Sequence, residues 1–236
     1  MSCTFATTCW ENDWRHILLT PGYLQTKMIG NHCFAFEERI LVINNVRNLK
    51  EVKEAAEKHL REGTLTRYLI ADEWVERAFA FFQLKKEDFP NDWVYYNALG
   101  PLIAIYVLQT EYLLYHTGDV YLAKPVDWIV SSIRFMRKNP KIQVANLIWN
   151  QQIGEVKQES YRKSWNFFYA KEGFSDQQFL VRKSTFQAPI YKEIREDSHH
   201  YPRGDVFEKR VFSFLKNRHY ERIICRKGSY THENIR

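Results

Sequence analysis

The sequence predicts an α/β fold, a single Rossmann-like domain with a mostly parallel central sheet and helices on both faces. Residues 39–43 form a continuous apolar run that ends at Asn44, as expected of a strand covered on both faces. Strand-like segments then alternate with segments of helical spacing, the pattern of a doubly wound sheet. With 236 residues, 45% of them hydrophobic, the chain can bury one sizeable core and needs no second domain.

The individual elements follow in order along the chain. Residues 3–9 are rich in β-forming side chains and predict the first strand, which stops at the polar cluster 10–13. Apolar residues at helical spacing between 49 and 60, followed by Gly63, predict the first helix. A polar loop is expected at 194–204. The other elements expected are strands at 68–71, 112–116, 144–149 and 222–225, helices at 72–84, 93–109, 126–136 and 207–215, and strands or short helical pieces at 165–169 and 178–181.

Neither a membrane span nor a secretory signal is expected. The longest apolar run, 99–108, is interrupted at its start by Gly100 and Pro101 and falls short of the roughly 20 residues that cross a bilayer. The N-terminus lacks the basic and then apolar stretches of a secretory signal. We therefore expect a cytoplasmic protein. Its four cysteines lack the paired spacing of a disulfide framework or zinc ribbon, so we expect them reduced and mostly structural.

The net charge of +6 favours anionic partners such as nucleotides, nucleic acid or acidic lipid. The basic excess is divided among three segments of the C-terminal half, 134–141, 203–210 and 216–226. A nucleic-acid-binding protein would concentrate its cations on one face, so this distribution disfavours nucleic acid as the partner.

Polar residues gather at the expected carboxyl ends of the strands, where open α/β sheets bind ligands. In chain order, they are Thr7, Thr8, Asn44, Asn45, Asp72 and Asp119. Asn and Asp also cap helices and form turns, which remains the alternative interpretation of Asn45 and Asp72. Their shared location favours a single ligand site.

No glycine-rich dinucleotide fingerprint and no P-loop is present, so a nicotinamide cofactor and a P-loop mechanism have no support. The charge of a diphosphate must then be met in another way. A magnesium or manganese ion held by a carboxylate does this by bridging the phosphate oxygens.

The segment Thr117-Gly118-Asp119-Val120-Tyr121-Leu122 resembles the acidic metal-binding turn of the GT-A glycosyltransferases, written Asp-any-Asp. The resemblance extends to the opening Thr7-Thr8-Cys9-Trp10, the order of strands and the ending Ser229-Tyr230-Thr231-His232. It implies a GT-A fold, a UDP- or GDP-linked sugar donor bound at Gly118 and Asp119, and Mn²⁺ or Mg²⁺ held by Asp119. Thr117 replaces the first acid of the turn, which removes one carboxylate from the site.

Three further roles follow from the resemblance. His232 is implied as a second metal ligand, since several GT-A enzymes supply a histidine near the C-terminus; the alternative is a solvated histidine. Asp176 is implied as a general base if the enzyme inverts, and otherwise as an acid in the first turn of a helix capped by Ser175. Trp10 is expected to stack on the donor base, or else to pack in the core.

The resemblance assigns donor binding to residues 1–125 and the acceptor side to residues 126–236. It implies a metal-dependent glycosyltransferase with a nucleotide-diphosphate sugar donor and an unknown acceptor. The alternative is a non-catalytic protein that binds a nucleotide or nucleotide sugar on a GT-A scaffold, because Thr117 weakens the metal site.

Overall fold

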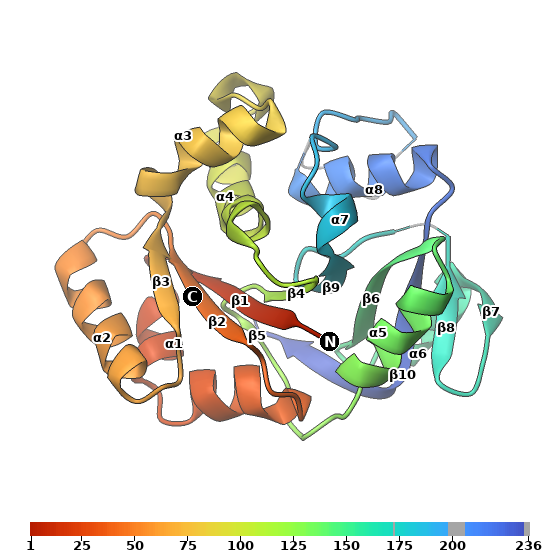
Figure 1. Ribbon diagram of the computed structural model, residues 1–236, viewed down its shortest axis with the longest axis horizontal. Coiled ribbons are helices and arrows are strands. Elements are labelled where there is room, and N and C mark those ends of the chain that lie inside the picture. Colours follow the sequence, from red (N-terminus) through yellow and green to blue (C-terminus); the bar gives the residue numbers. More distant parts are fainter. Residues whose placement is uncertain (172, 198–205, 234–236) are drawn as a thin grey trace.

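The computed structural model describes residues 1–171, 173–197 and 206–233 (Figure 1). Within them, the strands are β1 (Cys3–Cys9), β2 (Glu38–Ile43), β3 (Arg67–Ile70), β4 (Tyr112–His116), β5 (Val120–Tyr121), β6 (Ile142–Trp149), β7 (Ser160–Lys163), β8 (Phe167–Ala170), β9 (Gln178–Arg182) and β10 (Glu221–His232). The helices are α1 (Trp14–Leu19), the π-helix η1 (Tyr23–Ile29), the short turns η2 (Gly30–His32) and η3 (Lys86–Asp88), α2 (Leu49–Arg61), α3 (Ala71–Phe82), α4 (Asp92–Val107), α5 (Ile129–Lys138), α6 (Ile153–Glu159), α7 (Lys183–Phe186) and α8 (Phe207–Asn217).

The strands form one mixed sheet in the order β3-β2-β1-β4-β9-β6-β10-β8-β7, with β5 paired to β10. β3, β2, β1 and β4 are mutually parallel, as are β6 and β10. β9 enters antiparallel between β4 and β6, and β7 and β8 continue the sheet in antiparallel pairs. The predicted α/β class with a mostly parallel sheet is confirmed.

Helices cover both faces of the sheet, as predicted (Figure 1). One buried cluster joins α3, α4, α7 and α8 to side chains such as Ala6 and Val42, and the other joins α1, η1, α2 and α5 to Phe5 and Leu41. Neighbouring residues of β1 and β2 thus enter opposite clusters, because successive side chains of a strand point to opposite faces. Residues 40–43 of the expected run 39–43 are buried on both sides for this reason, whereas Arg39 is half-buried.

Most expected elements are present, and the differences are concentrated in short elements and in one long strand. α1, η1, α6 and β7, each seven residues or fewer, were not predicted, because such elements hold too few periodic positions to give a signal. The expected strand 222–225 extends to His232 through a register shift between Cys225 and Ser229. Of the expected loop 194–204, residues 198–204 lie outside the described residues.

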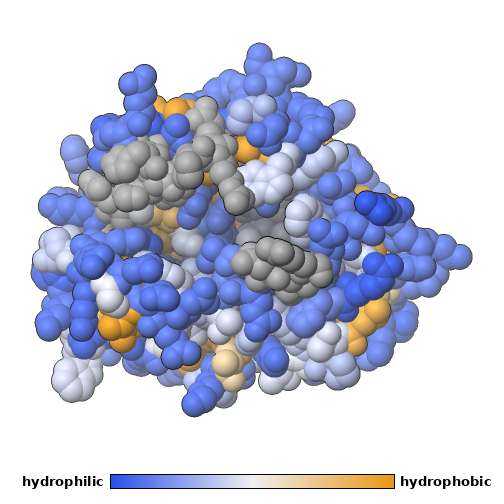
Figure 2. Space-filling view, turned by 180° about the vertical axis from the view of Figure 1, so that it is seen from behind, coloured by the Kyte–Doolittle hydropathy of each residue, from blue (hydrophilic) through white to orange (hydrophobic). Residues whose placement is uncertain are grey.

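In the part of the chain that the structure describes, no helix is long and apolar enough to cross a membrane. The face seen in Figure 2 is mostly hydrophilic, and its hydrophobic residues are scattered in small groups.

Candidate functional site

A closely packed glycine fixes the turn that carries the candidate acid. Residues 117–119 connect β4 to β5. A Cβ atom on Gly118 would stand 2.4 Å from Ile17 Cδ1 and 2.7 Å from the backbone oxygen of Thr8. Any side chain there would push the turn away from β1. Gly118 therefore sets the position of Asp119.

The carboxylate of Asp119 meets the imidazole of His232, which lies near the other end of the chain. β5 pairs antiparallel with the end of β10, with Val120 opposite His232, and the Glu233 N–H donates to the Asp119 carbonyl at 3.0 Å. This pairing places His232 Nε2 3.0 Å from Asp119 Oδ2. The two side chains remain 23% and 24% exposed, so the pair is open to a ligand from solvent.

Hydrogen bonds engage both side chains of this pair. The Thr117 hydroxyl donates to Asp119 Oδ1 at 2.8 Å and thereby holds the Asp119 carboxylate in one orientation. The hydrogen bond to Asp119 raises the pKa of His232, against the effect of burial. A metal ion that used both residues would have to displace the proton of His232, since a ligating imidazole is neutral.

Asp176 lies close enough to interact electrostatically with both Asp119 and His232. Its half-buried position in the segment before β9 raises its pKa to about 6; the His232 charge opposes that rise and the Asp119 charge adds to it. Residues 173–177 form no helix, and the Ser175 hydroxyl lies 3.3 Å from that of Tyr230. The helix-cap interpretation of Asp176 is therefore wrong.

Asp13 is a further acid at this site, and the sequence analysis missed it. It is buried, and its Oδ1 accepts a hydrogen bond from the Trp10 N–H at 2.8 Å. A Cβ on Gly118 would lie 2.8 Å from Asp13 Oδ2, so the acid packs against the turn. Burial raises the pKa of Asp13 to about 8, and the Asp119 charge contributes. Asp13 follows β1 and Asp119 follows β4, and these two strands are parallel neighbours. Acids that follow neighbouring parallel strands lie at the same edge of the sheet, so the strand order would have predicted that Asp13 lies near Asp119.

The predicted donor-binding residues around β1 differ in their access to solvent. Thr7 is fully buried within the strand, opposite His116 of β4. Thr8 is half-buried and donates to the Val42 carbonyl at 3.0 Å. Trp10 follows the strand directly and is also half-buried. The edge of the sheet thus offers Thr8 and Trp10 to a ligand, whereas Thr7 is enclosed.

Asn44, Asn45 and Asp72 follow the neighbouring strands at increasing distance from Asp119. Asn44 is buried, and its Nδ2 donates to the Tyr96 carbonyl at 2.7 Å, which holds α4 to the sheet. Asn45 is exposed with φ of 49°, and Asp72 is exposed in the first turn of α3, where the helix dipole favours an acid. Their strands lie two and three positions from β4, about 10 and 14 Å. Donor binding by these residues stays a prediction.

A buried histidine network lies beside this turn, and nothing in the sequence analysis identified it. His116 and His32 are fully buried, with ring centroids 4.8 Å apart. Gln178 Nε2 lies 3.1 Å from His116 Nε2, and Trp128 Nε1 donates to His32 Nδ1 at 2.9 Å. Burial lowers the pKa of both rings, that of His116 to about 3. Both imidazoles are therefore neutral at pH 7.

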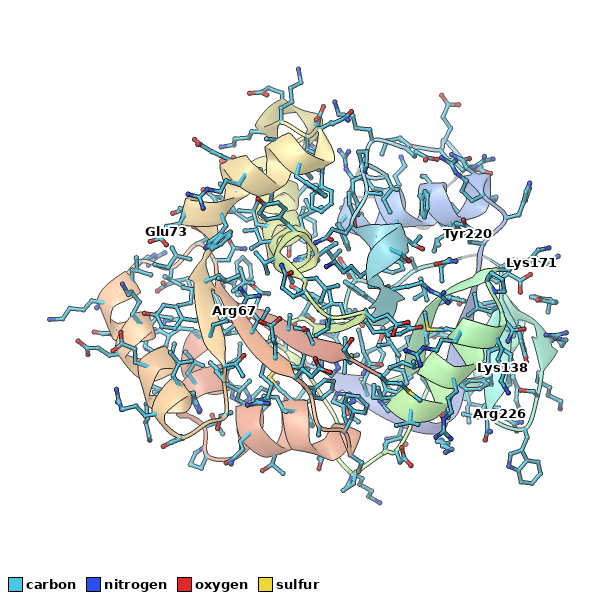
Figure 3. All side chains as sticks on the ribbon, in the orientation of Figure 1. Arg67, Glu73, Lys138, Lys171, Tyr220 and Arg226 are labelled. Atoms are coloured by element: carbon cyan, nitrogen blue, oxygen red, sulfur yellow. The ribbon has the colours of Figure 1, made fainter. Side chains whose placement is uncertain are left out.

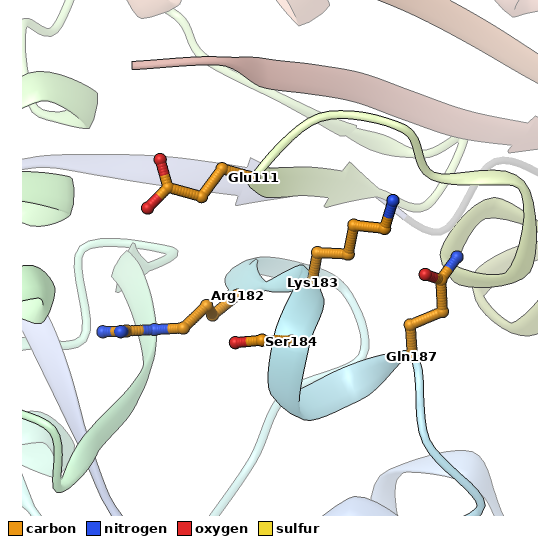
Figure 4. A pocket seen from close by; sticks show the side chains of 5 residues that line it. All are labelled: Glu111, Arg182, Lys183, Ser184 and Gln187. Carbon is orange, nitrogen blue, oxygen red and sulfur yellow. The ribbon is translucent and has the colours of Figure 1, made fainter.

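A polar cavity of about 460 Å³ opens near the other end of β4 (Figure 4). It is lined by Glu111, Arg182, Lys183, Ser184 and Gln187. Glu111 directly precedes β4, and its ion pair with Arg137 lowers the pKa of its carboxyl group. A strand of five residues spans about 17 Å, so this cavity is separate from the turn at Asp119.

Asp119 and His232 are the residues at this turn that could hold a metal ion. Among residues 1–171, 173–197 and 206–233, no three His, Cys, Asp or Glu side chains are grouped to hold a metal ion. The pair offers one carboxylate and one imidazole, ligands acceptable to manganese. Mg²⁺ and Mn²⁺ at such sites commonly take their remaining ligands from phosphate oxygens and water.

No protein-family description and no curated protein matches the chain. In structure, it resembles glucosyl-3-phosphoglycerate synthase from Mycobacterium tuberculosis in complex with Mn²⁺, UDP and glucosyl-3-phosphoglycerate, with 8% identity, a TM-score of 0.49, and coverage of 99% of this chain and 72% of that one. A second structure of that enzyme, with Mn²⁺, UDP and phosphoglyceric acid, gives 8% identity and 0.42 over 82% of this chain and 58% of that one.

The galactosyltransferase LgtC, in complex with donor and acceptor sugar analogues, gives 12% identity and a TM-score of 0.44, over 94% of this chain and 72% of that one. All three structures are of glycosyltransferases.

Proposed function

We propose that the protein is a metal-dependent glycosyltransferase with a UDP- or GDP-linked sugar as its donor. One observation carries the proposal: Asp119 and His232 meet 3.0 Å apart, partly exposed, where a parallel strand ends. Open α/β sheets bind ligands at this edge. A carboxylate and an imidazole are ligands for the divalent cation that accompanies a nucleoside diphosphate.

In this proposal, Asp119 and His232 would hold Mn²⁺ or Mg²⁺, and the ion would supply Lewis-acid stabilisation of the diphosphate leaving group. Thr117 orients the Asp119 carboxylate through its hydrogen bond to Oδ1. Gly118 lets the turn approach β1, and Trp10, half-buried just after that strand, supplies an aromatic face for the donor base. Thr8, Asn45 and Asp72 complete the proposed donor side, whereas the buried side chains of Thr7 and Asn44 support it from within the fold.

Asp176 is the proposed general base if the reaction inverts the anomeric centre. Burial raises the pKa of its carboxyl group, which makes the carboxylate a stronger base toward the proton of an acceptor hydroxyl. Its electrostatic interaction with His232 and Asp119 supports this assignment. On this assignment, residues 1–125 bind the donor and residues 126–236 contribute the acceptor side.

Isothermal titration calorimetry with UDP and GDP, with and without Mn²⁺, tests the proposal. Binding that requires Mn²⁺ is expected for one of the nucleotides, and Asp119→Ala should abolish it while the circular dichroism spectrum stays unchanged. Glu54→Gln, an exposed acid on α2, is the matched control and should bind as the wild type does. No Mn²⁺-dependent binding of any nucleoside diphosphate would refute the proposed function.

The second candidate is a non-catalytic binding protein on the same scaffold. It is favoured by Thr117 in place of an acid and by the two-residue ligand set at Asp119 and His232. It predicts nucleotide binding without release of sugar. Incubation with a panel of UDP- and GDP-sugars and Mn²⁺ separates the two, since even slow release of the nucleoside diphosphate identifies an enzyme.

A further inference from the structure

The hairpin between β7 and β8 carries a tryptophan side chain in solvent. The Trp165 side chain is 90% exposed, whereas the next most exposed large hydrophobic residue among those described, Leu19, is 57% exposed. Trp14 and Trp128, in contrast, are buried. An indole carries a large apolar surface and one polar N–H, so most tryptophans are largely buried. The exposure of Trp165 is therefore a feature to be explained.

Hydrogen bonds hold the tip of this hairpin in one conformation. The Ser164 N–H donates to the Phe167 carbonyl at 2.7 Å and closes the turn. Arg226 Nη1, from β10, donates to the carbonyls of Ser164 and Trp165 at 2.5 and 3.2 Å, and its backbone N–H donates to the Asn166 carbonyl at 2.9 Å. The indole is thus presented by an ordered turn, which lowers the entropy cost of binding a partner.

Positive charge surrounds the hairpin. Residues 160–171 contain no Asp or Glu, and Glu172 follows them directly. Two acids of the flanking segments are engaged within the fold, Glu159 with Arg222 and Glu221 with the Tyr161 hydroxyl. Lys138, Lys171 and Arg226 lie at the same end of the molecule as β7, β8 and β10 (Figure 3). The exposed cations of the hairpin and of the adjoining part of β10 are Arg162, Lys163, Lys171, Arg226 and Lys227.

We propose that this hairpin docks the protein on a membrane surface that contains anionic lipid, with Trp165 at the level of the headgroups. Tryptophan favours that depth because one part of the indole is apolar and its N–H can bind water or lipid oxygens. Clustered Lys and Arg residues are attracted to the negative surface potential of such a membrane. A nucleic acid is disfavoured because it would require aromatic platforms along a basic groove, whereas Trp165 stands on a turn. The proposal does not depend on the transfer reaction.

Co-sedimentation of the full chain with vesicles tests this surface. Vesicles of phosphatidylcholine alone are compared with vesicles that contain about one third phosphatidylserine, at low and high salt. The wild type should bind only the anionic vesicles, and binding should fall as salt screens the charges. Trp165→Ala should weaken binding about tenfold, because its indole area is lost from the interface. The double variant Lys163→Gln and Lys227→Gln should weaken binding and flatten its salt dependence.

Matched controls place the same changes elsewhere on the molecule. Trp93→Ala on α4, where the wild-type side chain is 42% exposed, and Lys50→Gln on α2, 86% exposed, should bind as the wild type does. Circular dichroism checks that each variant is folded. Equal binding by Trp165→Ala, no binding to anionic vesicles, or binding to single-stranded RNA without binding to vesicles would overturn the proposal. Quenching of tryptophan fluorescence by brominated lipid in the wild type, reduced in Trp165→Phe, would support it.

Discussion

The Asp119–His232 pair and the buried His32–His116 pair lie near the same turn, but their surroundings shift the pKa of an imidazole in opposite directions. His116 is fully buried without a carboxylate partner, and burial lowers its pKa. His232 is partly exposed and accompanied by Asp119, and that hydrogen bond raises its pKa. Solvent and a charged partner, rather than the residue type, thus decide in which direction the pKa of each histidine moves. The His32–His116 pair packs beneath the turn as neutral side chains. The Asp119–His232 pair faces solvent, where it is accessible to a ligand.

Gly118 connects the two regions, so its substitution is expected to have the largest effect. Gly118→Ala places a Cβ against the Thr8 carbonyl, which cannot rotate away, and should destabilise the fold by about 2–3 kcal/mol. Urea unfolding followed by circular dichroism measures this. The control Gly154→Ala in α6 meets no atom within 4 Å and should change stability by less than about 1 kcal/mol, in the stabilising direction. Equal effects of the two changes would mean that the turn tolerates a side chain.

The exposed pair can be broken without disturbing the buried one. His232→Gln removes an imidazole ligand and should weaken Mn²⁺-dependent nucleotide binding about tenfold, or 1.4 kcal/mol. Stability should change by less than about 1 kcal/mol, because the Asp119–His232 ion pair is partly solvated. Calorimetry and urea unfolding of the same variant check both statements. A large loss of stability with unchanged nucleotide affinity would make the pair structural.

The buried pair should make stability depend on pH. The unfolded chain protonates a histidine near pH 6.5, whereas folded His116 resists protonation down to about pH 3. The unfolded state therefore binds more protons in this window, and the stability contributed by neutral His116 is full above pH 6.5 and is lost as pH falls. Below pH 6, the slope should reach about 1.4 kcal/mol per pH unit for this residue. The slope should be smaller in His116→Gln when urea unfolding is measured at pH 7, 6 and 5, and an unchanged slope would contradict the assignment.

Adding a second acid to the turn is expected to have the smallest effect. Thr117→Asp adds a carboxylate beside Asp119, which should raise Mn²⁺ affinity about fivefold, or about 1 kcal/mol, and lower stability without metal through like-charge repulsion. Thermal shift with and without Mn²⁺ measures both. Thr117→Asn is the control of equal size, and a similar response from it would show that charge is not the cause.

The sequence alone determined the layers of the fold and the candidate acid. The pattern of apolar residues within a short segment predicted three elements that the structure confirms. They are the strand at 39–43, the helix at 49–60 and the strand at 112–116. Asp119 was recognised as an acid at a turn because a buried strand runs into a polar segment. These patterns depend only on residues that are close together in the sequence.

Only the tertiary structure decided what surrounds that acid. His232 reaches Asp119 because β10 continues past its register shift to pair with β5, and the sequence could supply this partner only through a family resemblance. Asp13 lies beside the turn because β1 and β4 are neighbours, and His116 becomes neutral because both faces of the sheet are covered. The distances between these side chains, their burial and their pKa values depend on the order of the strands, which pairs segments more than one hundred residues apart. No local pattern encodes that order, because it results from the packing of the whole chain.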